Sequence, residues 1–311
     1  MRKKSLVGVA GLFLLTALTA CGGSDTTTEN SVVETTEITS ASSTYPVTVG
    51  DLTLATQPMR IVSLSPTATE MLYVIGAGKQ VVAVDDYSNF PAEAVALGTA
   101  LSGFEPNVEA IAGFKPDLVV ISNDSGGLTD QLKTLSIPVF MAPAAATFDD
   151  AYAQIEQLGL LTGHLDTAVQ VSSQMQADIS AAVAEVKLPT TPLTYFHELD
   201  NTLYSATSNT FIGQVYSLFG LKNIADGVET GNDYPQLSAE VIVKANPDII
   251  FISDSDSVET VAARDGWGKL KAVTSNQVIS LPADIPSRWG PRLVEFVIAI
   301  RDAVLMTLAN A

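Results

Sequence analysis

Short apolar runs alternate along the chain with segments whose apolar positions recur at helical spacing. The runs that predict buried strands are residues 61–64, 81–84, 118–121 and 139–141 in the first half and 194–196, 249–252 and 278–280 in the second. Helical stretches lie between them, including residues 68–75 and 211–219, and each of these two stops at a glycine. Residues 291–308, which begin with a proline, predict a closing helix. Alternating strands and helices predict an α/β protein with mainly parallel sheets.

A long helical region separates the two halves. Residues 149–161 carry apolar side chains at helical spacing and end near Gly163, and residues 166–188 do the same before Pro189. The second stretch would be roughly 33 Å long as one helix and could act as a stiff strut. We therefore predict an N-terminal lobe over 45–148, a linking helical region over 149–188 and a C-terminal lobe over 189–311. Weak alternation around Gly50-Asp51 predicts a small hairpin at the start of the first lobe.

Two segments of the chain repeat each other. Residues 109–122 read EAIAGFKPDLVVIS and residues 240–253 read EVIVKANPDIIFIS, with six identities in fourteen positions. Asn107 and Ser238 stand two residues before the two segments, and both are good N-cap residues. Chance similarity between two helix-turn-strand units is the alternative. The matched caps favour two similarly built lobes, and a cleft between lobes is a common place for a small-molecule site.

The N-terminus resembles a bacterial lipoprotein signal. Three basic residues precede an apolar run over residues 7–18, which is too short for a membrane span of ~20 residues. The run ends in Leu-Thr-Ala-Cys, so the resemblance implies cleavage after residue 20 and lipid attachment at Cys21. A plain signal peptide with an incidental cysteine is the alternative. Residues 21–44 are rich in Ser and Thr and poor in large apolar residues, which predicts a disordered tether.

Charge and composition exclude several function classes. The formal net charge is −18, with 34 acidic and 16 basic residues, which argues against binding nucleic acid. The single cysteine excludes an intrachain disulfide and a multi-cysteine metal site, and we expect no metal. The chain has two histidines and lacks G-x-S-x-G, phosphate-loop and dinucleotide-binding motifs, so we expect no enzyme activity. A lipid-anchored hydrolase and an adhesion or scaffold protein are the alternatives.

Several motifs in order resemble one family. They are RIVSLSPTATE at 60–70, DYSNFP at 86–91, the segment 107–119, FIG at 211–213, LSAE at 237–240 and WGKLKAV at 267–273. Over about residues 58–311 the chain resembles the ABC-importer substrate-binding proteins for cobalamin and ferric siderophores. The resemblance implies a class III fold of two Rossmann-like α/β lobes joined by a single long backbone helix. It also implies a monomer, lipid-anchored at the extracytoplasmic face of the cell membrane, that delivers its ligand to a permease dimer with ATPase subunits.

The resemblance assigns permease docking to Glu109 and Glu240. The two acids hold equivalent positions in the repeat, as contacts to a two-fold symmetric partner require. The alternative is that each only complements the dipole of the helix that it begins.

Candidate ligand contacts cluster near strand ends. They are the turn residues Ser65, Pro66 and Thr67, the aromatic residues Tyr87, Phe104, Tyr204 and Tyr234, and the late residues Asp284, Arg288 and Trp289. Aromatic side chains from both lobes could clamp a flat ligand, although ordinary core packing is the alternative for each. The segment at 87–91 is more similar to cobalamin binders, so the resemblance favours a corrinoid over a ferric siderophore. Haem is a further alternative, with His197 at a strand end, beside Tyr87 or Tyr204, as its ligand. His164, at a helix break, is expected at the surface.

Overall fold

The computed structural model describes residues 44–99 and 101–310. The predicted signal peptide, Cys21 and almost all of the predicted tether lie outside the described residues. No helix within the described ranges is long and apolar enough to cross a membrane.

The N-terminal lobe contains a four-stranded parallel sheet. Its strands are β3 (Ile61–Leu64), β4 (Val81–Val84), β5 (Leu118–Ile121) and β6 (Val139–Met141), in the order β4-β3-β5-β6. The two central strands are buried along their whole length, since helices cover both faces of the sheet. The helices of this lobe are α1 (Pro66–Val74), α2 (Ala92–Val95), α3 (Val108–Gly113) and α4 (Leu128–Thr134). The predicted hairpin is present as β1 (Val47–Val49) and β2 (Leu52–Leu54).

The C-terminal lobe repeats this architecture. Its strands β7 (Thr194–Glu198), β8 (Lys222–Asn223), β9 (Ile249–Ile252) and β10 (Val278–Ser280) are parallel in the order β10-β9-β7-β8. Read in reverse, the order places β8, β7, β9 and β10 where the first sheet has β4, β3, β5 and β6. The helices are α7 (Phe211–Ser217), α8 (Ala239–Ala245), α9 (Val258–Ala262) and α10 (Lys271–Thr274). The predicted two-lobe α/β fold is therefore confirmed.

The repeated sequence has the same structural role in both lobes. Asn107 and Ser238 cap α3 and α8 by accepting hydrogen bonds from the helix amides, as predicted. The Asp of each Pro-Asp turn then fastens two neighbouring strands at their starts. The carboxylate of Asp117 accepts the amides of residues 59 and 60, just before β3, at 2.8 Å, and Asp248 accepts the amide and hydroxyl of Thr194 in β7 at 2.8 Å. The Pro-Asp turn is thus repeated in the sequence because its aspartate joins two neighbouring strands in each lobe.

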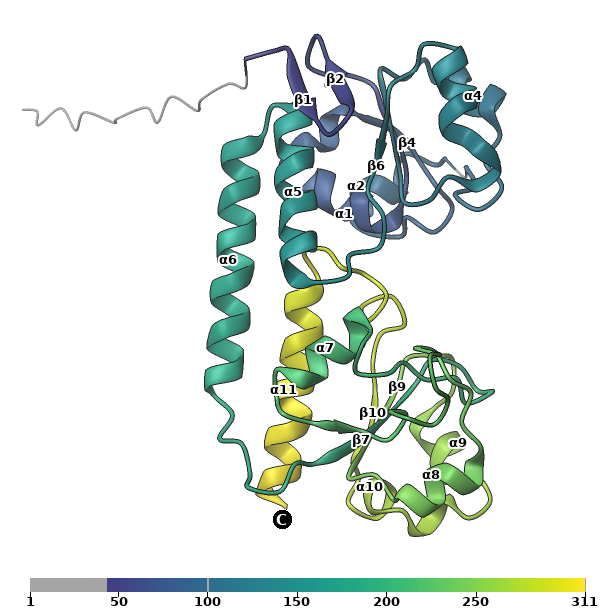
Figure 1. Cartoon of the computed structure of the whole chain (residues 1–311), viewed down its shortest axis with the longest axis vertical. Coiled ribbons are helices and arrows are strands. Elements are labelled where there is room, and N and C mark those ends of the chain that lie inside the picture. Colours follow the sequence, from purple (N-terminus) through teal and green to yellow (C-terminus); the bar gives the residue numbers. More distant parts are fainter. Residues whose placement is uncertain (1–43, 100, 311) are drawn as a thin grey trace, which may run out of the picture. The chain divides into compact units, whose positions relative to one another are not determined.

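Three long helices lie along the two lobes, and one of them joins the lobes (Figure 1). They are α5 (Phe148–Thr162), α6 (Leu165–Ala184) and the C-terminal α11 (Leu293–Ala309), and α6 packs against both others. With 20 residues, α6 is about 30 Å long and is the predicted single connecting helix. It ends at Ala184, before the predicted boundary at 188. Gly159 of α5 allows the close approach of α6, since a Cβ there would lie 2.3 Å from the Cβ of Ala168.

Gly213 in α7 provides a test of the C-terminal packing. A Cβ at this position would lie 2.2 Å from the carbonyl oxygen of Thr207 and 2.5 Å from the Cα of Ser208. Because both contacts are backbone atoms, Gly213→Ala is expected to lower the free energy of unfolding by ~3 kcal/mol, measured by urea denaturation. Gly113→Ala is the matched control, because a Cβ at Gly113 meets nothing within 4 Å. Equal stability of the two variants would contradict the packing described.

Candidate functional site

The carboxyl ends of the N-terminal strands open into a cavity of about 340 Å³. We call it the N-lobe cavity. Its wall is formed by Leu64, Ser65, Pro66, Thr67, Asp85, Tyr87, Gly103, Phe104, Ser122, Asn123, Ser287, Arg288 and Trp289. Seven of the predicted ligand contacts are in this set: Ser65, Pro66, Thr67, Tyr87, Phe104, Arg288 and Trp289. The strand ends bring the early residues together, as expected for a ligand site on a parallel sheet.

A second cavity, of about 460 Å³, lies against the C-terminal lobe. We call it the C-lobe cavity. It is lined by residues 144–146 after β6, by residues 209–212 at the start of α7, by Asp233 and Tyr234, and by Pro286, Ser287 and Trp289. Ser287 and Trp289 line both cavities, so the two adjoin at these residues and form one cleft between the lobes.

The aromatic residues of the cleft are open to solvent. Tyr87 is 57% exposed, Phe104 67% and Tyr234 50%, so core packing does not account for them. Tyr87 and Phe104 contact each other edge to face, with ring centroids 5.5 Å apart. Exposed aromatic side chains of both lobes therefore border the cleft, which is the arrangement that a flat apolar ligand requires.

Residues 281–292 connect β10 to α11, and we call them the crossing segment. Arg288 donates from Nη2 to the carbonyl oxygen of Tyr87 and to Oδ1 of Asp284, each at 3.2 Å. The amide nitrogen of Asn89 donates to Oδ2 of Asp284 at 2.7 Å, and Trp289 Nε1 donates to Oε1 of Gln154 at 3.0 Å. The segment follows a strand of the C-terminal lobe but is bonded to the N-terminal lobe. It thus holds Arg288 and Trp289 in the cavity walls, whereas Asp284 lines neither cavity.

Glu70 of α1 forms buried ion pairs with two arginines of the crossing segment. Its side chain is 2% exposed, and Oε1 lies 3.6 Å from Nε of Arg288 and 3.5 Å from Nη1 of Arg292. Burial raises the pKa of Glu70 to about 7, although the charges of Arg292 and Arg288 act to lower it.

This pKa predicts a pH-dependent stability difference. Because the pKa of Glu70 is higher in the folded than in the unfolded state, its contribution is fully present below pH 4.5 and is lost as the pH rises through 7. The difference in unfolding free energy between Glu70→Gln and wild type should therefore shift by about 3 kcal/mol in favour of the variant between pH 4 and pH 8. Urea denaturation at both pH values measures it, with exposed Glu105→Gln as control. A pH-independent difference would refute the assignment.

Three residues predicted for the site line neither cavity, and Asp284 of the crossing segment is one of them. Tyr204 forms a strand-like bridge with Gln236 and lines neither cavity. The expectation that His197 faces the cleft is wrong, because its side chain is completely buried in β7. Its Nδ1 bonds the hydroxyl of Tyr216 at 2.5 Å and its Nε2 bonds Ser253 at 3.1 Å, and burial lowers its pKa to about 3. His197 is a neutral core residue and cannot serve as a haem ligand in this conformation. His164 is half-buried rather than fully at the surface.

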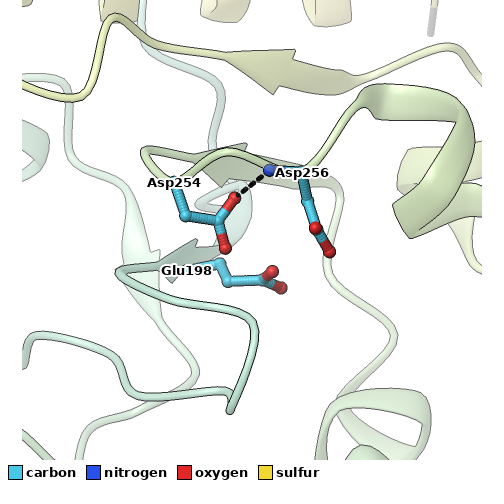
Figure 2. Close-up of side chains that lie close together, drawn as sticks. All are labelled: Glu198, Asp254 and Asp256. Carbon is cyan, nitrogen blue, oxygen red and sulfur yellow. Dashed lines mark hydrogen bonds between the residues drawn. The ribbon is translucent and has the colours of Figure 1, made fainter.

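An acidic cluster at the end of β7 was missed by the sequence analysis. One carboxylate oxygen from each of Glu198, Asp254 and Asp256 lies within 4.8 Å of the other two (Figure 2). Arg264 is bound among them, at 2.6 Å from both oxygens of Glu198 and at 2.8 Å from Asp256. The guanidinium also stacks over Trp267. Its single charge is paired with Glu198 and Asp256, which makes these three residues a structural ion-pair network. Asp254 accepts the amide of Asp256 through Oδ1.

Glu109 and Glu240 stand in the first turns of α3 and α8, and both are exposed. The equivalence of the two helices in the two sheets gives the two acids equivalent positions on their lobes.

Comparisons with known proteins agree on one family. A model described as periplasmic binding protein matches residues 61–285. An uncharacterised ABC transporter substrate-binding lipoprotein of Bacillus subtilis, YvrC, is 30% identical over 98% of both chains. The cobalamin-binding protein of Halobacterium salinarum is 33% identical over 81% of this chain and 72% of its own. A solved structure of a possible iron-binding periplasmic solute-binding protein of Staphylococcus epidermidis has 25% identity and a TM-score of 0.70, covering 80% of this chain and 99% of its own.

Proposed function

The chain belongs to the periplasmic binding protein family, and from that premise we propose that it captures a corrinoid in the cleft between its lobes. Members of the family bind small solutes outside the cytoplasm and work with a permease and its ATPase. The proposal concerns which solute this chain binds, how it is anchored and how it contacts the permease.

One observation carries the corrinoid proposal. Exposed aromatic residues of both lobes border the cleft, whose two cavities meet at Trp289. Arg288 lies in the wall of the N-lobe cavity. A corrinoid is a large, flat ring with a rim of carboxamide groups. Aromatic faces suit the ring, while Arg288 in the cavity wall supplies a hydrogen-bond donor for the amide oxygens. The relative that is named a cobalamin-binding protein supports the same ligand.

We also propose that Cys21 carries the lipid anchor. The basic, apolar and small-residue pattern of residues 2–21 supports it, and the Bacillus subtilis relative is named a lipoprotein. The anchor would keep the ligand-binding lobes at the extracytoplasmic face of the membrane.

Docking through Glu109 and Glu240 completes the proposal. One exposed acid on each of two similar lobes fits a permease made of two like subunits, with a basic residue on each.

Calorimetric titration tests the ligand. The full-length chain in detergent would be titrated with cyanocobalamin, haemin and a ferric hydroxamate in separate experiments. We expect one-to-one binding of cyanocobalamin, at least about 100-fold tighter than of the other two. Tighter binding of haemin or of the ferric hydroxamate would overturn the corrinoid proposal and leave the family assignment intact.

A further inference from the structure

A chain of buried hydroxyl groups lies under the N-lobe cavity. The hydroxyl of Thr69 is 2.9 Å from that of Ser63 and 2.9 Å from that of Ser88, and all three residues are at most 5% exposed. Ser63 in turn donates to the carbonyl oxygen of Ser65. The network fixes the hydroxyl of Ser88, which lies beside Asp85 and acts to lower the pKa of that carboxyl group.

Asp85 lies at the end of this network, and one of its carboxylate oxygens accepts no hydrogen bond from the described residues. It follows β4, lines the N-lobe cavity and is 3% exposed, and its Oδ1 has no hydrogen-bond partner among the described residues. Buried polar atoms in folded proteins are almost always bonded, so an exception beside a cavity calls for a partner that enters from the cavity.

The surroundings of Asp85 keep its carboxylate at the cavity wall. A Cβ at Gly103 would lie 3.1 Å from Oδ2 of Asp85 and 3.0 Å from the carbonyl oxygen of Leu64, so a larger residue there would push against the carboxylate. Burial, and to a smaller extent the charge of Asp86, raise the pKa of Asp85 to about 6. A ligand that placed a second carboxylate beside Asp85 would bind less favourably, because like charges repel strongly when water is excluded.

We infer that Asp85 is a specificity residue that accepts a hydrogen bond from an N–H of the ligand and disfavours ligands that place a carboxylate there. The inference rests on the proposed function and deepens it. The carboxamide rim of a corrinoid supplies such N–H groups, whereas the propionates of haem supply only charged oxygens. Arg288, in the wall of the same cavity, would donate to either an amide oxygen or a carboxylate, so Asp85 provides the discrimination that Arg288 does not.

The test compares cyanocobalamin with its three monocarboxylic acid derivatives, in each of which one propionamide is hydrolysed to a carboxylate. The full-length wild-type chain is expected to bind at least one isomer about tenfold more weakly than cyanocobalamin. Asp85→Asn should bring that ratio below about threefold, because an asparagine amide can donate to a carboxylate. Asp86→Asn removes the same charge from an exposed neighbour and should keep the wild-type ratio.

The outcomes separate the inference from the proposed function. An unchanged ratio in Asp85→Asn, or equal binding of all isomers by the wild type, overturns the role of Asp85 while cyanocobalamin binding still supports the function. Absence of cyanocobalamin binding by the wild type overturns both. Circular dichroism melting checks that Asp85→Asn is folded, and Asp85→Ser, which also removes the charge, is the second variant if it is not.

Discussion

Replacing Glu109 and Glu240 together by lysine is expected to reduce delivery of the ligand to the permease by at least about 100-fold. In the proposed docking, each substitution would convert an attraction toward a basic permease residue into a repulsion. Charge pairs at interfaces have coupling energies of ~1.5 kcal/mol or more, so two reversed pairs exceed 3 kcal/mol. The measurement is uptake of radiolabelled cyanocobalamin into liposomes that contain the permease and ATPase, with the wild-type or variant chain outside.

The control separates docking from helix stabilisation. Asp130 and Glu259 are also exposed acids in the first turns of helices, one in each lobe. The double variant Asp130→Lys with Glu259→Lys therefore removes the same favourable interaction of an acid with a helix dipole, and it leaves the proposed docking residues unchanged. Uptake should stay within about twofold of wild type for this control, and the dissociation constant for cyanocobalamin should be unchanged in both double variants. Equal loss of uptake in both would refute docking through Glu109 and Glu240.

Trp289→Ala is expected to weaken cyanocobalamin binding by about 100-fold, which corresponds to ~2.7 kcal/mol. Trp289 lines both cavities, and its indole is held by the hydrogen bond to Gln154. Truncation removes an indole that lines both cavities. Trp289→Phe keeps an aromatic face but loses the hydrogen bond and part of the apolar surface, so its affinity should lie between those of the wild type and the alanine variant. Titration calorimetry measures all three.

Trp267→Phe is the matched control for this series. Trp267 is the other tryptophan of the chain, and it is buried in the C-terminal core against Phe196. Its replacement should lower stability and leave the dissociation constant within about twofold of wild type. If Trp289→Ala binds cyanocobalamin as tightly as the wild type does, the cleft is not where this ligand binds.

Local patterns in the sequence were sufficient to predict most of the fold. The seven apolar runs are seven of the eight strands in the two sheets, and the repeat at 109–122 and 240–253 correctly predicted equivalent units with caps at Asn107 and Ser238. These features depend on neighbours a few residues apart, which the order of apolar and polar residues records. Strand β8 was missed because it has only two residues, Lys222 and Asn223, neither of them apolar.

Contacts between distant residues could not be predicted in the same way. Glu70 meets Arg288 and Arg292 more than 200 positions away, and no spacing in the sequence signals that pairing. His197 was misplaced because a strand end alone does not say whether a ring faces a cleft or a core. Asp85 was not a candidate at all, since its unusual property is an unbonded oxygen, which only the packed structure reveals.

Cobalt anomalous scattering tests the central claim most directly. Crystals of the protein grown with cyanocobalamin would be measured at the cobalt absorption edge, where the metal of the corrinoid is located independently of the atomic model. We predict one strong peak between Tyr87 and Tyr234, beside Trp289. A peak elsewhere, such as in the cavity of about 570 Å³ lined by Tyr73, Phe90 and Pro291, or no peak with saturating ligand, would contradict corrinoid binding in the cleft.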